Sequence, residues 1–288
     1  MVSGGKQSIA QKSGTGLLFG GWLGASVASY VAFILLLIVA DVCFVLAQMD
    51  GTAEVFEVLA SPELQDSVVL TFVSCTVTAI LAVFFAVPIG YALSRYRFVG
   101  RSLIDAILDI PVILPPLVIG LSLLILFNQF PPLESGSSLE SGLNWLGIEV
   151  TNTKLAVVVA QFTVAAAFAV RAMKLSFDQI DTRVEEVAMS LGGSRGRAFF
   201  DVVLPRSYKG VLAAGTLAWA RALGEFGPIL VFAGATRGRT EVLSTSVFLE
   251  INTGNIEGAV VISLLMITLA MTTILVVRVV CQKGGEGA

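Results

Sequence analysis

The chain has 288 residues, of which 56% are hydrophobic and 14% charged, and this composition is that of a membrane protein. The formal net charge of −3 comes without a clustered basic face, which excludes the usual mode of nucleic-acid binding. Histidine is absent, so haem ligation, metal binding and general base catalysis through imidazole are excluded for this chain alone. We expect no catalytic residue, metal or cofactor, since no Ser or Cys lies beside a recognisable base.

Six apolar segments have, or nearly have, the roughly 20 residues that a helix needs to cross a bilayer. They are Trp22–Ala47, Val68–Leu93, Ile104–Phe127, Leu155–Leu175, Val211–Ala233 and Ala259–Val280. The third contains Pro111, Pro115 and Pro116, which predict a kinked or broken helix. The sequence therefore predicts an all-α, polytopic membrane helix bundle with six transmembrane helices, surrounded by the lipid of the cell membrane.

The positions of Lys and Arg predict the orientation of these segments, because cytoplasmic loops are enriched in both residues. With the N-terminus inside, most of the 18 basic residues fall on the cytoplasmic side. Both termini are then cytoplasmic, with tails at 1–21 and 282–288 and a transmembrane domain at 22–281. The first apolar run is longer than the core of a secretory signal and lacks a clear cleavage site, so we expect it to remain as an anchor.

The loop between the fourth and fifth segments, residues 176–208, predicts two short helices joined by a tight turn. Thr182 and Glu185 have capping-box spacing for the first helix. Its apolar face is predicted to consist of Val184, Val187, Ala188 and Leu191. Gly192 and Gly193 should end it, Ser194 should cap the second helix, and Pro205 should stop that one. Amphipathicity alone favours a hairpin that rests on lipid headgroups.

The spacing within this loop resembles the "EAA...G.........I.LP" signature of permease subunits of ABC importers. Glu186, Ala188 and Gly192 stand in register with it, as do Leu204 and Pro205, while Val187 and Val202 replace an Ala and an Ile. The resemblance implies the type I importer architecture, with the first short helix docked in a groove of a nucleotide-binding subunit. Residues expected at this coupling site are Glu185, Glu186, Ala188, Leu191, Gly192, Ser194, Arg195, Leu204 and Pro205.

Within the coupling loop, Glu186 is expected to fix the hairpin through hydrogen bonds, and Arg195 and Arg197 to meet acidic groups of the partner. The chain contains no G-x-x-x-x-G-K-[ST] phosphate-binding loop. If ATP drives transport, a separate subunit must therefore bind and hydrolyse it, and this chain is not itself an enzyme.

The fifth apolar segment places Arg221 and Glu225 four residues apart, on one face of a helix. Ionisable groups at membrane depth are costly, so they pair or face a cavity. One interpretation is an ion pair, within or between subunits, that only holds the bundle together. The other places Arg221 near the translocation path, with Glu225 tuning its charge, and Gly224 and Gly227 allowing the bend that a gate requires.

The stretches "ARALGEFG" and "FAGATRGRTEVLSTSVF" resemble the oxyanion branch of these importers, and the likeness covers most of residues 66–280. It implies two permease copies, two ATPase subunits and an extracytoplasmic oxyanion-binding protein. Molybdate is the favoured substrate, with sulfate or tungstate as alternatives. The first 60 or so residues match less well.

Two readings from other classes remain. An ion-coupled secondary transporter would use Asp41, Asp109 or Glu225 as proton or cation sites. A membrane scaffold or sensor would need only the six spans. Neither accounts for the signature in the coupling loop.

Overall fold

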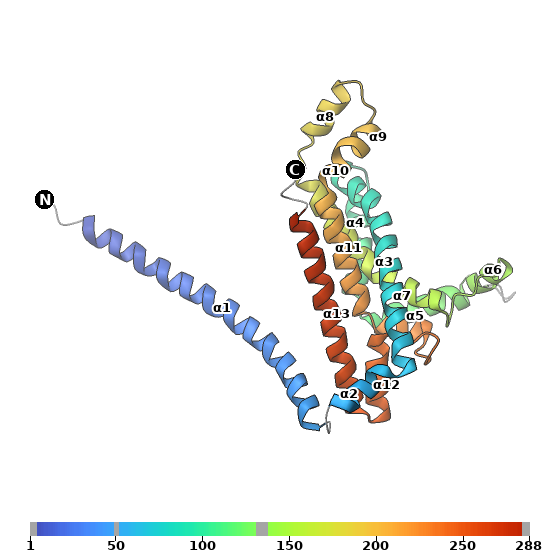
Figure 1. The fold of residues 1–288 in the computed structure, drawn as a ribbon. Coiled ribbons are helices and arrows are strands. Elements are labelled where there is room, and N and C mark those ends of the chain that lie inside the picture. Colours follow the sequence, from blue (N-terminus) through green and yellow to red (C-terminus); the bar gives the residue numbers. More distant parts are fainter. Residues whose placement is uncertain (1–4, 49–51, 131–137, 284–288) are drawn as a thin grey trace. The chain divides into compact units, whose positions relative to one another are not determined.

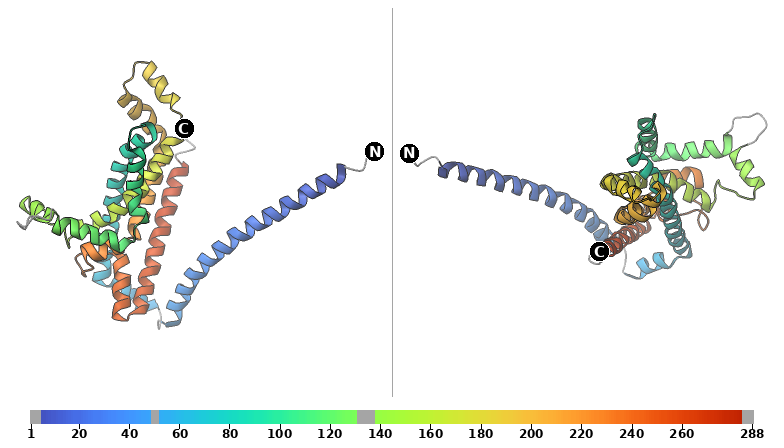
Figure 2. Two further views of the ribbon diagram at one scale, coloured as in Figure 1. Left: turned by 180° about the vertical axis from the view of Figure 1, so that it is seen from behind. Right: turned by 90° about the horizontal axis from the view of Figure 1, so that it is seen from above.

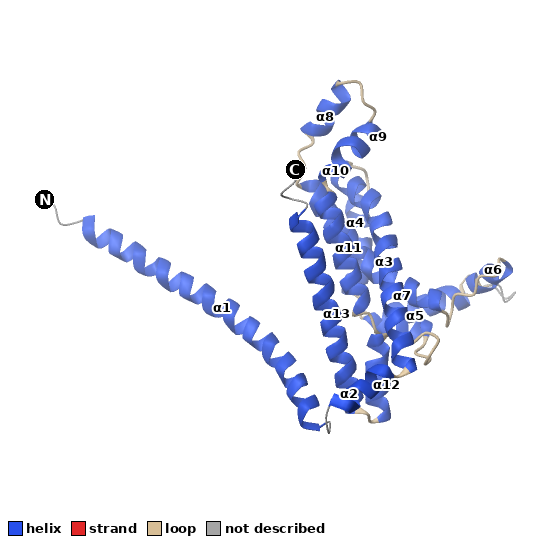
Figure 3. Cartoon of the chain, in the orientation of Figure 1, coloured by secondary structure: helices blue, strands red, loops and turns tan. Residues whose placement is uncertain are grey.

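The computed structural model describes residues 5–48, 52–130 and 138–283, and within these ranges every regular element is a helix (Figure 3). The chain divides into two units, Met1–Glu54 and Val55–Ala288. In the first unit, α1 (Gly5–Gln48) is one long helix whose part Phe19–Gln48 is apolar enough to cross a membrane. The predicted boundary between residues 21 and 22 falls inside α1, and the division into tail and membrane domain stays a prediction.

The second unit is a bundle built around α3 (Pro62–Arg95), α7 (Lys154–Asp178), α11 (Tyr208–Leu223) and α13 (Ile256–Lys283), as Figures 1 and 2 show. A short helix, α2 (Thr52–Ala60), precedes α3. The apolar sequences of α3, α7 and α13 make each long enough to cross a membrane. The hydropathy pattern thus located these three helices correctly.

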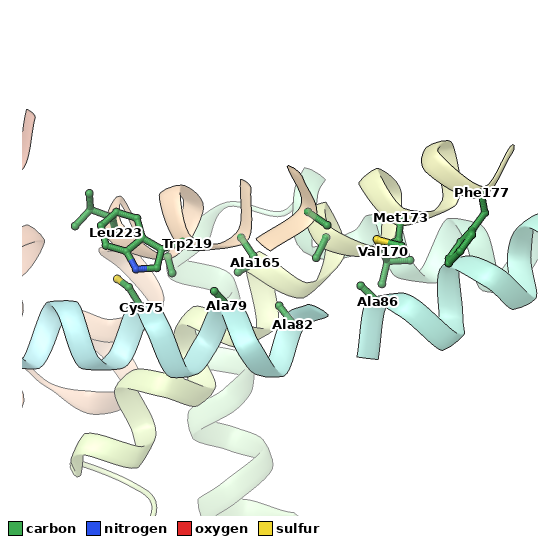
Figure 4. Close-up of a cluster of buried hydrophobic side chains, with 14 of the residues drawn as sticks. Cys75, Ala79, Ala82, Ala86, Ala165, Val170, Met173, Phe177, Trp219 and Leu223 are labelled. Atoms are coloured by element: carbon green, nitrogen blue, oxygen red, sulfur yellow. The ribbon is translucent and has the colours of Figure 1, made fainter. Parts of the chain in front are cut away.

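Small side chains let α3 and α7 pack closely. Within a bilayer the hydrophobic effect does not hold helices together, because lipid tails are as apolar as the side chains, so close van der Waals packing does so instead. The buried cluster between them and α11 contains Cys75, Ala79, Ala82, Ala86, Ala165, Val170, Met173, Phe177, Trp219 and Leu223 (Figure 4). A Cβ atom at Gly90 would lie 2.9 Å from Lys174 N and from Met173 Cβ. Glycine is therefore required where α3 crosses α7.

The third predicted span is broken, as its prolines indicated. The chain bends by 111° between helix α4 (Arg101–Ile113) and helix α5 (Pro116–Gln129). Pro115 and Pro116 stand at the break, where they can donate no backbone hydrogen bond that would continue α4. A short helix, α6 (Leu139–Trp145), follows α5 beyond residues 131–137, which lie outside the described ranges.

The fifth predicted span is also interrupted. Helix α11 ends at Leu223, and a π-helical turn, η2 (Ile229–Ala233), follows after the segment 224–228. Helix α12 (Leu243–Thr253) then leads into α13. Among the described residues, four helices are long and apolar enough to span a membrane, or five if the bent α4–α5 pair counts as one. The six-span count stays a prediction.

The loop between α7 and α11 forms a hairpin of short helices at one end of the bundle (Figure 1). Its elements are α8 (Arg183–Ser190), α9 (Arg195–Ala198), the π-turn η1 (Phe199–Val203) and α10 (Leu204–Arg206). Helices α3 and α13 both finish at this same end (Figures 1 and 2). The side of the membrane on which this end of the bundle lies stays a prediction.

Candidate functional site

The start of α8 differs from the prediction, because the expected capping box is wrong. Thr182 has helical angles (φ −61°, ψ −26°) and its side chain makes no capping hydrogen bond. Instead, Arg183 N donates to Asp181 Oδ1 over 2.9 Å. The Glu185 carboxylate is not available for capping because residues of α3 bind it.

The turn between the two arms of the hairpin has the predicted chemistry. Gly192 has φ +90°, a left-handed conformation that costs glycine nothing. A Cβ at Gly193 would lie 2.8 Å from Ala188 O, so the second glycine is needed for space. Ser194 caps α9 by accepting a hydrogen bond from Arg197 N at 3.4 Å. Both glycines and the serine cap are confirmed.

Pro205 does not end the second arm, and that prediction is wrong. The arm continues through η1 into α10, which ends at Arg206. Leu204 N donates to Phe199 O, five residues earlier, and this π-helical step starts a new helical turn. Pro205 thus occupies the first turn of α10, where a missing N–H breaks no helical bond.

The outer surface of the hairpin carries exposed apolar and basic side chains. Val187, Leu191 and Phe200 are 57%, 84% and 65% exposed. A shallow cavity of about 310 Å³ lies between the arms, lined in part by Ala188, Leu191, Gly192, Arg197 and Asp201. Arg197 also lines this cavity, and both Arg195 and Arg197 are exposed. Exposed apolar side chains near charged ones are typical of a protein contact surface.

The two adjacent glutamates of α8 have opposite environments. Glu185 is buried and forms an ion pair with Arg95 of α3, with Nε 2.6 Å from Oε1. Glu186 is exposed, and its carboxylate has no hydrogen bond or ion pair with any described residue. The expectation that Glu186 fixes the hairpin is therefore wrong: Glu185 does so.

The predicted pair in the fifth segment forms at the break after α11. Arg221 Nη1 lies 2.5 Å from Glu225 Oε2, and Glu225 is 1% exposed. The contact is an ion pair by distance, although neither carboxylate oxygen has hydrogen-bond geometry with a described residue. The Arg221 guanidinium also lies 5.7 Å from the ring centre of Phe168. The mutual ion pair is thus present; a role in the translocation path is untested.

The two broken spans meet at their breaks. A Cβ at Gly227 would lie 2.8 Å from Pro116 Cβ, and a Cβ at Gly120 would lie 2.8 Å from Pro228 Cα. Gly224 is different, since its Cβ would have nothing nearer than Arg221 O at 4.0 Å. Of the two glycines expected to permit a bend, only Gly227 is required by close packing.

Two of the acidic residues that a secondary transporter would use, Asp109 and Glu225, are in ion pairs. Asp109 of α4 forms an ion pair and a hydrogen bond with Arg171 of α7. One turn away, Lys174 Nζ lies 2.6 Å from Asp105 Oδ2. Among the described residues, no three acidic or cysteine side chains gather as metal ligands.

Comparison with known proteins assigns the chain to a family. Residues 83–283 match the family described as "Binding-protein-dependent transport system inner membrane component". The sulfate transport system permease protein CysT of Escherichia coli K12 is 35% identical, and the alignment covers 77% of this chain and 78% of that protein. The molybdenum transport system permease protein ModB of the same organism is 33% identical, with 68% and 86% covered.

A third relative and a solved structure extend the likeness. The molybdate/tungstate transport system permease protein WtpB of Thermococcus kodakarensis is 29% identical over 81% of this chain and 85% of that protein. A chain of a bacterial alginate ABC transporter, solved in complex with an alginate pentasaccharide-bound periplasmic protein, shares the fold. Its TM-score is 0.70 over 93% of this chain and 94% of that chain, at 14% identity. This chain, a multi-pass membrane protein, belongs to the family of binding-protein-dependent transport system inner membrane components.

Proposed function

We propose that the chain is the permease subunit of an ATP-driven importer of an oxyanion, with molybdate as the first candidate. The observation that carries the proposal is the α8–α9 hairpin, where the importer signature coincides with an exposed apolar surface. Relatives named for sulfate, molybdenum and molybdate/tungstate transport support the oxyanion class. The proposed assembly contains two copies of the chain, two ATPase subunits and an extracytoplasmic oxyanion-binding protein.

The hairpin would dock on the ATPase subunit through its outer surface. Burying Val187, Leu191 and Phe200 removes apolar area from water, which is the main favourable contribution in most protein contacts. Arg195 and Arg197 are exposed on the same hairpin, where they would meet acidic groups and favour the correct orientation. ATP hydrolysis then belongs to the partner.

The translocation gate would lie where the two broken spans meet. Here the Arg221–Glu225 pair occupies the end of α11, and Gly227 packs against Pro116. A buried carboxylate beside a partly exposed guanidinium leaves a moderated positive charge, which would suit passage of an anion without trapping it.

Molybdate is preferred over sulfate and tungstate because of the likeness in the "LGEFG" and "FAG" stretches. Sulfate remains an alternative, since the sulfate permease of Escherichia coli is 35% identical and the molybdenum permease of the same organism 33%. In an importer fed by a binding protein, that protein captures the anion, so the test must include it.

The proposal is tested by purifying the chain from its own membranes and identifying the proteins that accompany it. A stoichiometric ATPase subunit is expected; a chain that repeatedly comes alone would favour an ion-coupled transporter. The purified complex, placed in vesicles with its binding protein, should take up molybdate only with ATP, and excess sulfate or tungstate measures its selectivity.

A matched pair of variants tests the docking surface. Leu191→Asp places a charge at an exposed apolar residue of the hairpin and should release the ATPase subunit. Leu146→Asp makes the same change at an exposed leucine just after α6, away from the hairpin, and should retain it. Equal retention in both variants would contradict docking at this surface.

A further inference from the structure

Glu185 is the one side chain of α8 that is buried. Its neighbours Val187 and Leu191 point away from the bundle and are exposed. A burial of this kind is costly for a carboxylate unless it is paired and hydrogen-bonded. The side chain that attaches α8 to the bundle is therefore a charged one, and its partners determine what α8 moves with.

Both oxygens of this carboxylate are bound by the last turn and a half of α3. Arg95 Nε donates to Oε1 at 2.6 Å, and the Tyr91 hydroxyl donates to Oε2 at 2.9 Å. Tyr91 and Arg95 are four residues apart, so they share one face of α3. Two directional bonds to one face fix the position of α8 and also its rotation.

Arg95 extends the attachment to the end of α7. Its Nη2 donates to Ile180 O at 2.8 Å, just beyond the last residue of α7. The neighbouring Ser94 hydroxyl donates to Asp178 Oδ1 at 2.5 Å. The ends of α3 and α7 are thus tied together at the point where α8 joins them.

Tyr91 links the second arm of the hairpin to the same place. Its ring centre lies 4.5 Å from that of Phe199 in η1 and 5.6 Å from that of Phe177 in α7. Aromatic contacts at these separations add to the burial of the rings. One arm is therefore held by Glu185 and the other by Phe199, and both are held at the end of α3.

Helix α3 can carry a displacement through the bundle. Its 34 residues span about 50 Å at 1.5 Å per residue. Near its other end, the Thr71 hydroxyl oxygen accepts a hydrogen bond from Leu243 N, the first residue of α12, at 2.9 Å. This bond, toward the end of α3 away from the hairpin, joins α3 to α12, so a shift that passes along α3 beyond Pro88 would reach α12.

We propose that Glu185 is an internal positioning residue that makes α8 and α3 one rigid body, so that a displacement of the hairpin by the ATPase subunit moves α3. This inference rests on the proposed function. It assigns adjacent glutamates to different tasks: Glu185 transmits the movement inward, while Glu186, exposed and with no partner for its carboxylate among the described residues, is free to face the ATPase.

The experiment compares Glu185→Gln with Glu257→Gln in the full transporter in vesicles, with uptake and ATP hydrolysis measured together. Glu185→Gln keeps the size of the side chain but removes its charge. We expect the ATPase subunit to remain bound and the anion taken up per ATP hydrolysed to fall about 10-fold, within the range of measured couplings between sites. Glu257→Gln should leave this ratio unchanged, because Glu257 is exposed in the first turn of α13 and lies outside the coupling loop.

A double-substitution cycle separates transmission from general damage. Arg95→Gln should lower the same ratio at least as much, because it also removes the bond to Ile180 O. Adding Glu185→Gln to Arg95→Gln should make the ratio no worse than Arg95→Gln alone, because the interaction between the two residues is already lost. If the losses of the two single variants multiply in the double variant, the proposal is overturned. A wild-type ratio in Glu185→Gln would also overturn it. Tyr91→Phe, which keeps the ring and removes one hydrogen bond, should lower the ratio about 3-fold even if a charge variant fails to fold. If the wild-type chain binds no ATPase subunit, the proposed function itself is wrong, and this inference falls with it.

Discussion

Replacing Gly227 by alanine tests whether the two broken spans are locked together at their breaks. The added Cβ would lie 2.8 Å from Pro116 Cβ and 3.0 Å from both Leu117 N and Pro116 C. These atoms belong to a proline ring and to backbone, so none can move away as the end of a flexible side chain could. Either α5 or the segment after α11 must shift.

The magnitude follows from two opposing effects. Overpacking at a close contact costs about 1–3 kcal/mol. Alanine also reduces the freedom of the unfolded chain, which offsets about 0.4–1 kcal/mol where the backbone conformation allows it. Gly227 has no positive φ, so this gain applies. We expect a net loss of about 1–2 kcal/mol in the free energy of unfolding.

Gly224→Ala is the matched control, three residues earlier in the same break. Its Cβ would meet nothing nearer than 4.0 Å, and φ is −84°. Thermal unfolding in detergent, followed by tryptophan fluorescence, should show Gly227→Ala melting several degrees below wild type and Gly224→Ala at or slightly above it. Identical melting of the two variants would refute the packing argument, because it would mean that Pro116 does not confine residue 227.

Three further outcomes are expected. Gly192→Pro should uncouple ATP hydrolysis from uptake while leaving the helix content by circular dichroism unchanged, because proline cannot adopt φ +90°; coupled uptake at the wild-type rate would contradict this. Arg221→Gln should lower the free energy of unfolding by about 3–5 kcal/mol by leaving Glu225 buried without its counter-charge, and adding Glu225→Gln should recover most of that loss in a melting assay. Burial raises the pKa of Glu241, in the loop before α12, above that of a glutamate in the unfolded chain. The folded state therefore has its full stability below the unfolded pKa, where Glu241 is protonated, and loses stability as the pH rises through the raised native pKa. Glu241→Gln should therefore raise the melting temperature at neutral pH and do so little near about pH 4, whereas an equal effect at both values would show that the carboxylate is not destabilising.

Local signals in the sequence predicted the local parts of this structure. A long apolar run is sufficient to locate α3 or α7, and the prolines of the third segment predicted its break. The angle of 111° at that break was not predictable, because it depends on how α5 packs. Gly120 of α5 fits against Pro228, more than 100 residues later, and no local pattern connects the two.

The errors in the hairpin have the same origin. Gly192 and Ser194 act within a few residues of themselves, and both were predicted correctly. Glu185 was assigned to a capping box because Thr182 is three residues away, yet its partner Arg95 is separated by 90 residues. Pro205 was expected to end a helix, because nothing in the local pattern marks the π-turn that accommodates it.

Under the proposed coupling, α3 connects the hairpin to the break after α11 through a buried polar chain. The Thr78 hydroxyl of α3 donates to Gln161 Oε1 of α7 at 3.2 Å, and Gln161 Nε2 donates to Ala222 O of α11 at 3.3 Å. Ala222 lies three residues before Glu225, so this carbonyl belongs to the last turn before the break. Buried bonds of this kind are costly to leave unmade. A displacement of α3 that preserves them moves the end of α11, and with it the Arg221–Glu225 pair.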